Sequence, residues 1–199
     1  MRKQSLIKEI WFRLSFFIFV VLGFFPRLAF PACIDDICFS DKTVIATENL
    51  VLEGVGLLEY LKFDMYAAAF YLPQNRKKIA TEDVLDPSIS KKLVIHYKRD
   101  IKVSWMNKAA ERIIKKNPTI DYPSVESRVK EIGDAYIKVE KGDRYALSYD
   151  AEGQRTTLLL NDQKVTEISG GDFARAYFGI WISEYSANQE LRAKLLNLD

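Results

Sequence analysis

Residues 63–72 read FDMYAAAFYL, and this stretch decides the fold. Successive residues of a β-strand point to opposite sides, so the odd-numbered residues share one face and the even-numbered residues share the other. Both faces are apolar apart from Asp64. The small side chains of Ala67–Ala69 leave room for something to lie against the sheet. A helix of the same chain is the usual occupant of such a space, and a ligand is the alternative.

Short alternating segments on either side of this stretch indicate the rest of a sheet. They cover residues 50–57, 92–99, 145–149, 155–160 and 165–168. Gly54 and Gly56 interrupt the first segment, which indicates that the backbone bends there or approaches another element closely. The last three segments are separated by short turns and predict an antiparallel meander.

Four helices are predicted from apolar residues at helical spacing. The first covers residues 103–117, and the second opens at Pro123. A third begins at residues 170–172, and Ser186 with Gln189 forms a capping box for the fourth. Strands, two helices, strands and two helices in that order predict an α+β fold in which one sheet is covered by helices.

Composition and charge exclude several classes of protein. The chain has 199 residues, 48% hydrophobic and 28% charged, which excludes disordered, collagen-like and polytopic membrane proteins. The formal net charge is +2, but residues 1–32 hold five basic residues and one acidic residue. Residues 33–199 therefore carry 24 basic and 26 acidic residues, a net charge of −2. Such a body offers no basic field for phosphates, so no nucleic-acid partner is expected.

The N-terminus has the pattern of an export signal. Residues 14–25 read LSFFIFVVLGFF and follow several basic residues. Twelve helical residues rise about 18 Å, well short of the ~30 Å hydrocarbon core of a bilayer. We therefore predict a signal peptide over residues 1–32, with an uncleaved membrane anchor as the alternative. Residues 33–43 then form an N-terminal tail, and residues 44–199 form the single folded domain.

Cys33 and Cys38 are the only cysteines of the chain. In an oxidising compartment they are expected to close a small disulfide loop. Cleavage after Ala32 would instead make Cys33 the first residue and allow its lipid modification, as in a lipoprotein. Two thiols and the single distant His96 do not supply a structural zinc site, so no metal is predicted.

Four segments, taken together and in order, point to a known family. They read LVLEGVG at 50–56, KFDMYAAAFYLP at 62–73, HYKRD at 96–100 and GGDFARAYFGIWISE at 170–184. In this order the chain resembles the chalcone isomerase superfamily, and in particular its bacterial exported branch. The resemblance implies an open-faced sandwich, with helices layered on one face of a large antiparallel sheet. It also implies a periplasmic location for the exported protein.

The resemblance implies two functional classes, which share one cleft. Some members close a chalcone by intramolecular Michael addition, and others bind fatty acids without chemistry. In both, an arginine stands two residues after the second glycine of the GxG segment, where this sequence has Leu58. Tyr66 takes the place of a polar hydroxyl of the plant enzymes, whose tyrosine and asparagine on the next helix have no counterpart here. Because losing one oxyanion donor typically costs ~3–4 kcal/mol, isomerase chemistry is poorly supported.

The resulting prediction is a non-catalytic exported protein that binds a hydrophobic ligand such as a fatty acid, without a cofactor. Its cleft is expected to be lined by Leu58, Tyr66, Ala68, Met106, Ile113 and Tyr177. Two other classes stay open: an isomerase or lyase acting on an enone-like substrate, and a structural interaction module of the envelope. The sequence does not decide the oligomeric state.

Two further candidate residues, Arg99 and His96, lie outside this predicted cleft. Arg99 precedes Asp100 at a strand-to-helix junction, and it is the candidate for binding an anion, with an ordinary ion pair as the alternative. His96 is the only histidine. Because no serine or thiol pattern accompanies it, we interpret His96 as a structural or surface side chain.

Overall fold

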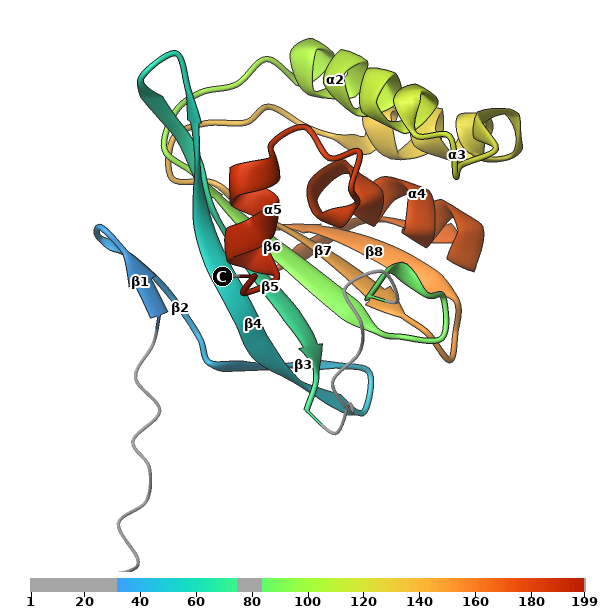
Figure 1. The fold of residues 1–199 in the computed structure, drawn as a ribbon, viewed down its shortest axis with the longest axis horizontal. Helices are drawn as coiled ribbons and strands as arrows, with labels where there is room; N and C mark the ends of the chain where they lie inside the picture. Colours follow the sequence, from blue (N-terminus) through green and yellow to red (C-terminus); the bar gives the residue numbers. More distant parts are fainter. Residues whose placement is uncertain (1–31, 75–83, 199) are drawn as a thin grey trace, which may run out of the picture. The chain divides into compact units, whose positions relative to one another are not determined.

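The computed structural model describes residues 32–74 and 84–198. Within these residues, seven strands form one antiparallel sheet in the order β3-β4-β5-β6-β7-β8-β9. Their bounds are β3 Lys42–Ile45, β4 Glu48–Tyr60, β5 Phe63–Pro73, β6 Lys91–Tyr97, β7 Arg144–Asp150, β8 Arg155–Leu160 and β9 Gln163–Ser169. The helices are α2 Val103–Lys116, α3 Tyr122–Ala135, α4 Gly171–Ile182 and α5 Gln189–Leu195. Figure 1 shows these helices gathered on one face of the sheet, which confirms the predicted α+β fold.

The stretch that decides the fold forms β5, and its two faces enter two different cores. Ala68, Phe70 and Leu72 belong to the main core between the sheet and the helices. Ala67 and Ala69 belong to a smaller cluster on the opposite face of the sheet. The alternation in the sequence therefore assigns the side chains of residues 66–72 to the correct sides.

The two glycines of β4 are required by the close approach of α5. The strand runs through Gly54 and Gly56 without ending, with a bulge between Leu52 and Gly54. A Cβ atom on Gly54 would lie 2.1 Å from the carbonyl oxygen of Lys194, and one on Gly56 would lie 2.6 Å from Cδ1 of Leu191. Only residues without a side chain allow the helix to pack this close to the strand.

The start of α5 differs from its prediction. The N-cap residue is Asn188, whose side-chain oxygen accepts a hydrogen bond from the backbone N–H of Leu191 at 2.8 Å. Gln189 does reach Ser186, with 3.0 Å between Nε2 and Oγ, but these residues do not cap the helix. The predicted capping box is wrong because an asparagine side chain, two residues later, reaches the free backbone N–H groups of the first turn.

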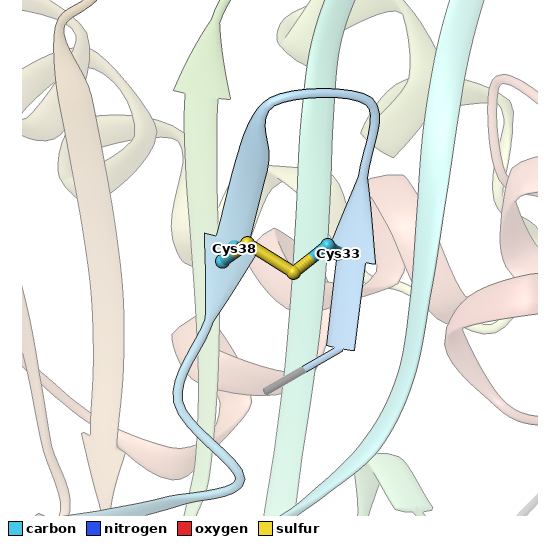
Figure 2. Close-up of a disulfide and its surroundings, with 2 residues drawn as sticks. All are labelled: Cys33 and Cys38. Atoms are coloured by element: carbon cyan, nitrogen blue, oxygen red, sulfur yellow. A yellow bond between two sulfur atoms is a disulfide. The ribbon is translucent and has the colours of Figure 1, made fainter. Parts of the chain in front are cut away.

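A disulfide hairpin precedes the sheet. Its strands are β1, Ala32–Ile34, and β2, Ile37–Phe39, and Cys33 is joined to Cys38 across them with an S–S distance of 2.11 Å (Figure 2). The side chains of Ile37 and Phe39 are buried in the smaller core cluster. The segment predicted as a tail thus holds ordered structure, and β3 begins two residues before the predicted start of the domain at residue 44.

The predicted signal peptide lies outside the described residues except for Ala32. Among the residues that the structure does describe, no helix is long and apolar enough to cross a membrane.

Candidate functional site

An apolar cavity of about 180 Å³ lies between one end of the sheet and the helices. Strands β4, β5 and β6 supply one wall, and α2, α4 and the start of α5 supply the others. Its lining contains aliphatic side chains, four tyrosines, one tryptophan and one asparagine, and no charged side chain among the described residues. A concave apolar space of this kind is the usual form of a small-molecule binding site, although typical sites enclose ~300–1,000 Å³.

The structure brings five of the six predicted cleft residues together around this cavity. They are Leu58, Tyr66, Met106, Ile113 and Tyr177. Leu58 is half-buried and packs against the main core, so it is neither sealed in the interior nor free in solvent.

Ala68 is the exception, and its assignment to the cleft is corrected by the structure. Its side chain is fully buried in the main core and does not line the cavity. In the sheet, Ala68 pairs with Gly56, and Leu191 of α5 lies directly over that glycine. Helix α5 therefore fills the space that the small side chains leave, and the cavity lies nearer the end of the strand.

Four polar lining residues were not predicted as part of the cleft: Tyr97, Tyr136, Trp181 and Asn188. Tyr97 is the Cα partner of Tyr66 in the neighbouring strand, so the two rings lie side by side with centroids 5.7 Å apart. Their adjacency follows from the strand register, which the sequence alone does not fix. Trp181 lies on the broad apolar face of α4. Its position on that face is the only feature of the sequence that could have assigned it to the cleft.

Hydrogen bonds among the aromatic residues connect the walls of the cavity. The indole Nε1 of Trp181 donates to the hydroxyl of Tyr66 at 3.0 Å. The hydroxyls of Tyr136 and Tyr177 lie 3.4 Å apart and form a second, longer hydrogen bond. Tyr97 makes no hydrogen bond through its hydroxyl to any residue within 32–74 or 84–198.

All four tyrosines of the lining are neutral over a wide range of pH. Burial raises the pKa of Tyr136 to about 12, although its hydrogen bond to Tyr177 partly opposes this shift. Burial likewise raises the pKa of Tyr66, Tyr97 and Tyr177 above the ordinary value for a phenol. The cavity therefore presents phenol O–H groups, and neither a cation nor an anion, to anything that enters it.

Arg99 does not take part in this cavity. Its guanidinium lies over the ring of Phe63, 4.3 Å from the ring centroid, near the turn between β4 and β5. No carboxylate of the described residues lies within ion-pair distance of it. The neighbouring Asp100 accepts a hydrogen bond from the backbone N–H of Lys141 at 2.8 Å, which ties together the loops on either side of the helices α2 and α3.

His96 lies on the opposite face of the sheet from the cavity. It borders an open polar cleft with Lys92 and Arg144, beside the disulfide hairpin. Across the described ranges, no group of three or more potential metal ligands comes together. The described residues that line the cavity include no cation to polarise a carbonyl, and Leu58 occupies the position that the resemblance assigns to an arginine.

Comparisons with known proteins agree with this architecture. Among solved structures, a fatty-acid binding protein of Arabidopsis thaliana is similar, with a TM-score of 0.63 and 14% sequence identity over 81% of this chain and 92% of that one. At this identity the likeness shows the fold. Among curated proteins, none matches the chain in sequence. A sequence model of a family described as chalcone isomerase-like matches residues 32–197, most of the chain. The chain therefore belongs to the chalcone isomerase-like family.

Proposed function

We propose that this protein binds a hydrophobic small molecule, such as a fatty acid, in the cavity between the sheet and the helices, and does so without catalysis. The single observation that carries the proposal is the apolar cavity lined by Leu58, Met106 and Ile113 without a charged side chain. Burying an apolar ligand there gains roughly 25 cal/mol for each Å² removed from water. The similar Arabidopsis protein, described as binding fatty acids, supports the same class of ligand.

The volume of the cavity limits what enters it. At about 180 Å³ it is smaller than most ligand sites, but an apolar cavity of about 150 Å³ is enough to bind benzene. We therefore propose a short or medium acyl chain, or a single ring, as the buried part of the ligand. A longer chain would extend past the lining residues or require Met106 to change its rotamer.

We further propose that the protein belongs to a bacterial branch of the family and works in the periplasm. The apolar run at residues 14–25 supports export, and a disulfide between Cys33 and Cys38 is typical of an oxidising compartment. Cell fractionation of the full chain, with a label at its C-terminus, is expected to place the processed protein in the periplasm. Recovery of the unprocessed chain in the membrane would favour the anchor.

The binding proposal is tested by native mass spectrometry of the full chain purified without detergent. We expect a co-purified hydrophobic molecule, or, if none is retained, saturable binding of added decanoic acid. A protein that carries no ligand and binds none of the acids tested would contradict the proposal. Turnover of a chalcone above the uncatalysed rate, lost in Tyr66→Phe, would instead favour an enzyme.

A further inference from the structure

One hydroxyl group in the cavity has no hydrogen-bond partner within residues 32–74 and 84–198, although its residue is almost completely buried. Tyr97 is 3% exposed, and its hydroxyl forms no hydrogen bond with the described part of the chain. Thr156 Oγ1 is the only fully enclosed side-chain polar atom without a partner among the described residues, so the Tyr97 hydroxyl has open space beside it. Because Tyr97 lines the cavity, that open space is the cavity itself.

Two further hydroxyl hydrogens in the cavity also lack acceptors within the described residues. An indole N–H only donates, so the oxygen of Tyr66 accepts the bond from Trp181 and its own hydrogen remains unused. The hydroxyls of Tyr136 and Tyr177 use only one of their two hydrogens in the bond between them. The lining thus offers three O–H donors to an oxygen atom placed in the cavity.

A buried donor without an acceptor destabilises the free protein, so a ligand that supplies an acceptor removes this cost when it binds. The charge of that acceptor matters. The titratable groups of the lining are its four tyrosines, all neutral, and no cation of the described chain faces the cavity. A carboxylate would lose its hydration there without gaining a counter-charge, whereas a neutral carbonyl oxygen loses far less.

We propose that the cavity selects ligands whose apolar body carries a neutral carbonyl oxygen, and that the Tyr97 hydroxyl donates the hydrogen bond that recognises it. Ketones, esters and protonated carboxylic acids belong to this class. The inference rests on the proposed binding function and deepens it by naming the polar group of the ligand. A fatty acid would accordingly bind in its protonated form.

Three single-ring probes of similar size test the inference on the full chain at pH 8. Ethylbenzene has no acceptor, acetophenone has a neutral carbonyl, and benzoate has a carboxylate. Their dissociation constants are measured by calorimetry for the wild type, for Tyr97→Phe, and for Tyr71→Phe as a matched control. Tyr71 lies on the opposite face of the sheet, where its hydroxyl donates to the carbonyl oxygen of Ser40 at 2.9 Å.

We expect Tyr97→Phe to weaken acetophenone by about twofold to tenfold, the worth of one neutral hydrogen bond, and to leave ethylbenzene unchanged. Benzoate is expected to bind the wild type more weakly than acetophenone, and Tyr71→Phe to change no affinity. The variant Tyr97→Phe should melt no lower than the wild type, because the Tyr97 hydroxyl makes no hydrogen bond with the described part of the chain that the variant could lose.

The carbonyl stretch of bound acetophenone provides a readout that does not depend on affinity. Infrared spectra should show it at lower frequency in the wild type than in Tyr97→Phe. Suppose that ethylbenzene binds, but that Tyr97→Phe changes neither the affinity for acetophenone nor the frequency of its carbonyl stretch. The inference is then overturned and the binding function stands. The inference would also be overturned if the wild type bound benzoate more tightly than acetophenone, or if Tyr97→Phe failed to fold. If none of the three probes binds, the binding function fails and the inference fails with it.

Discussion

Trp181 donates a hydrogen bond from its indole Nε1 to the hydroxyl of Tyr66 at 3.0 Å, and this bond joins α4 to β5 beside the cavity. The two residues are 115 positions apart in the sequence. The same indole contacts the ring of Tyr177, with centroids 6.1 Å apart. Helix α4 and strand β5 are therefore held together beside the cavity, and the bond sets the position of the Tyr66 hydroxyl in its lining.

The position of Leu58 allows the missing cation to be restored. Leu58→Arg places a guanidinium at the half-buried edge of the cavity, where a carboxylate would gain ~1.5–3 kcal/mol from a charged hydrogen bond. We expect the affinity for decanoic acid at pH 8 to rise by about tenfold to a hundredfold, measured by calorimetry. The gain should fade as the pH falls through the pKa of the ligand's carboxyl group, because the neutral acid has no charge for the cation to attract.

The matched control for this variant is Leu61→Arg. Leu61 is 74% exposed in the turn between β4 and β5 and does not line the cavity. It should leave the affinity for decanoic acid unchanged. A large fall in the melting temperature of Leu58→Arg, without any gain in affinity, would mean that Leu58 is packing and that no anion reaches this edge.

Gly54 tests whether α5 determines the shape of the cavity. In Gly54→Ala the new Cβ would meet the backbone carbonyl of Lys194, so α5 must move away from β4. Overpacking of this kind typically costs about 1–3 kcal/mol of stability. Because Leu191 of α5 lines the cavity, ligand affinity should fall as well.

Chemical denaturation in urea measures the loss in Gly54→Ala. Gly179→Ala provides the control, because a Cβ there meets nothing closer than 3.6 Å and alanine favours a helix interior. We expect Gly179→Ala to be neutral or slightly stabilising. Equal stability of Gly54→Ala and the wild type would show that α5 does not need the close approach.

The disulfide is expected to stabilise the protein without affecting the site. Cys33 and Cys38 are five positions apart, and closing so short a loop contributes about 2 kcal/mol in the chain-entropy account. Reduction should lower the urea midpoint of the wild type and leave that of the double variant Cys33→Ser, Cys38→Ser unchanged. Ligand affinity should persist, since the hairpin packs on the face opposite the cavity. A loss of ligand binding on reduction would contradict the expectation that the disulfide hairpin does not affect the cavity.

Because Lys91 is buried, we expect the free energy of unfolding to depend on pH. Its side chain is fully buried, with Nζ donating to the carbonyl oxygen of Asp86 at 3.0 Å and lying 4.8 Å from the ring centroid of Tyr149. Burial lowers the pKa of Lys91 to about 7, with Asp86 partly opposing the shift. Between that pH and the unfolded value of about 10.4 the unfolded chain binds more protons, so stability rises with pH across this window.

We expect the free energy of unfolding to increase by about 2 kcal/mol between pH 7 and pH 9 in the wild type, measured in urea. Lys91→Met lacks the titrating group and should show a flatter dependence over the same range. The difference between the two chains isolates this residue from the other titrating groups. Parallel pH profiles would indicate that Lys91 keeps an ordinary pKa in the fold.

The sequence predicts the sheet well because the alternation of side chains along a strand fixes which face each one takes. Both faces of residues 66–72 are assigned correctly, and the short turn predicted between the last two segments forms between β8 and β9, with positive φ at Asn161 and Asp162. The two glycines of β4 indicated a close approach, which α5 makes. In each case the signal comes from the local backbone and from burial.

The lining of the candidate site is harder to predict than the sheet, because it depends on which residues of the sheet the helices cover. Ala68 and Leu58 look equally suited to a cleft in the sequence, but α5 packs over the first and leaves the second at the edge of the cavity. The hydroxyl of Tyr97 acquires its role only from the register that sets it beside Tyr66. The two strands of the disulfide hairpin were not predicted, because each has three residues and is too short to show the alternation typical of a β-strand.

Calorimetric titration of decanoic acid, at a pH below the pKa of its carboxyl group, into the full chain and into Ala109→Leu tests whether the ligand occupies this cavity. Ala109 lies on α2 and lines the cavity, so a leucine there would fill space that the ligand needs. Ala135→Leu, the same change at a half-buried position of α3 that does not line the cavity, is the control. The account predicts saturable binding to the wild type and to Ala135→Leu, reduced at least tenfold in Ala109→Leu. Equal binding to all three chains, or binding to none, would contradict it.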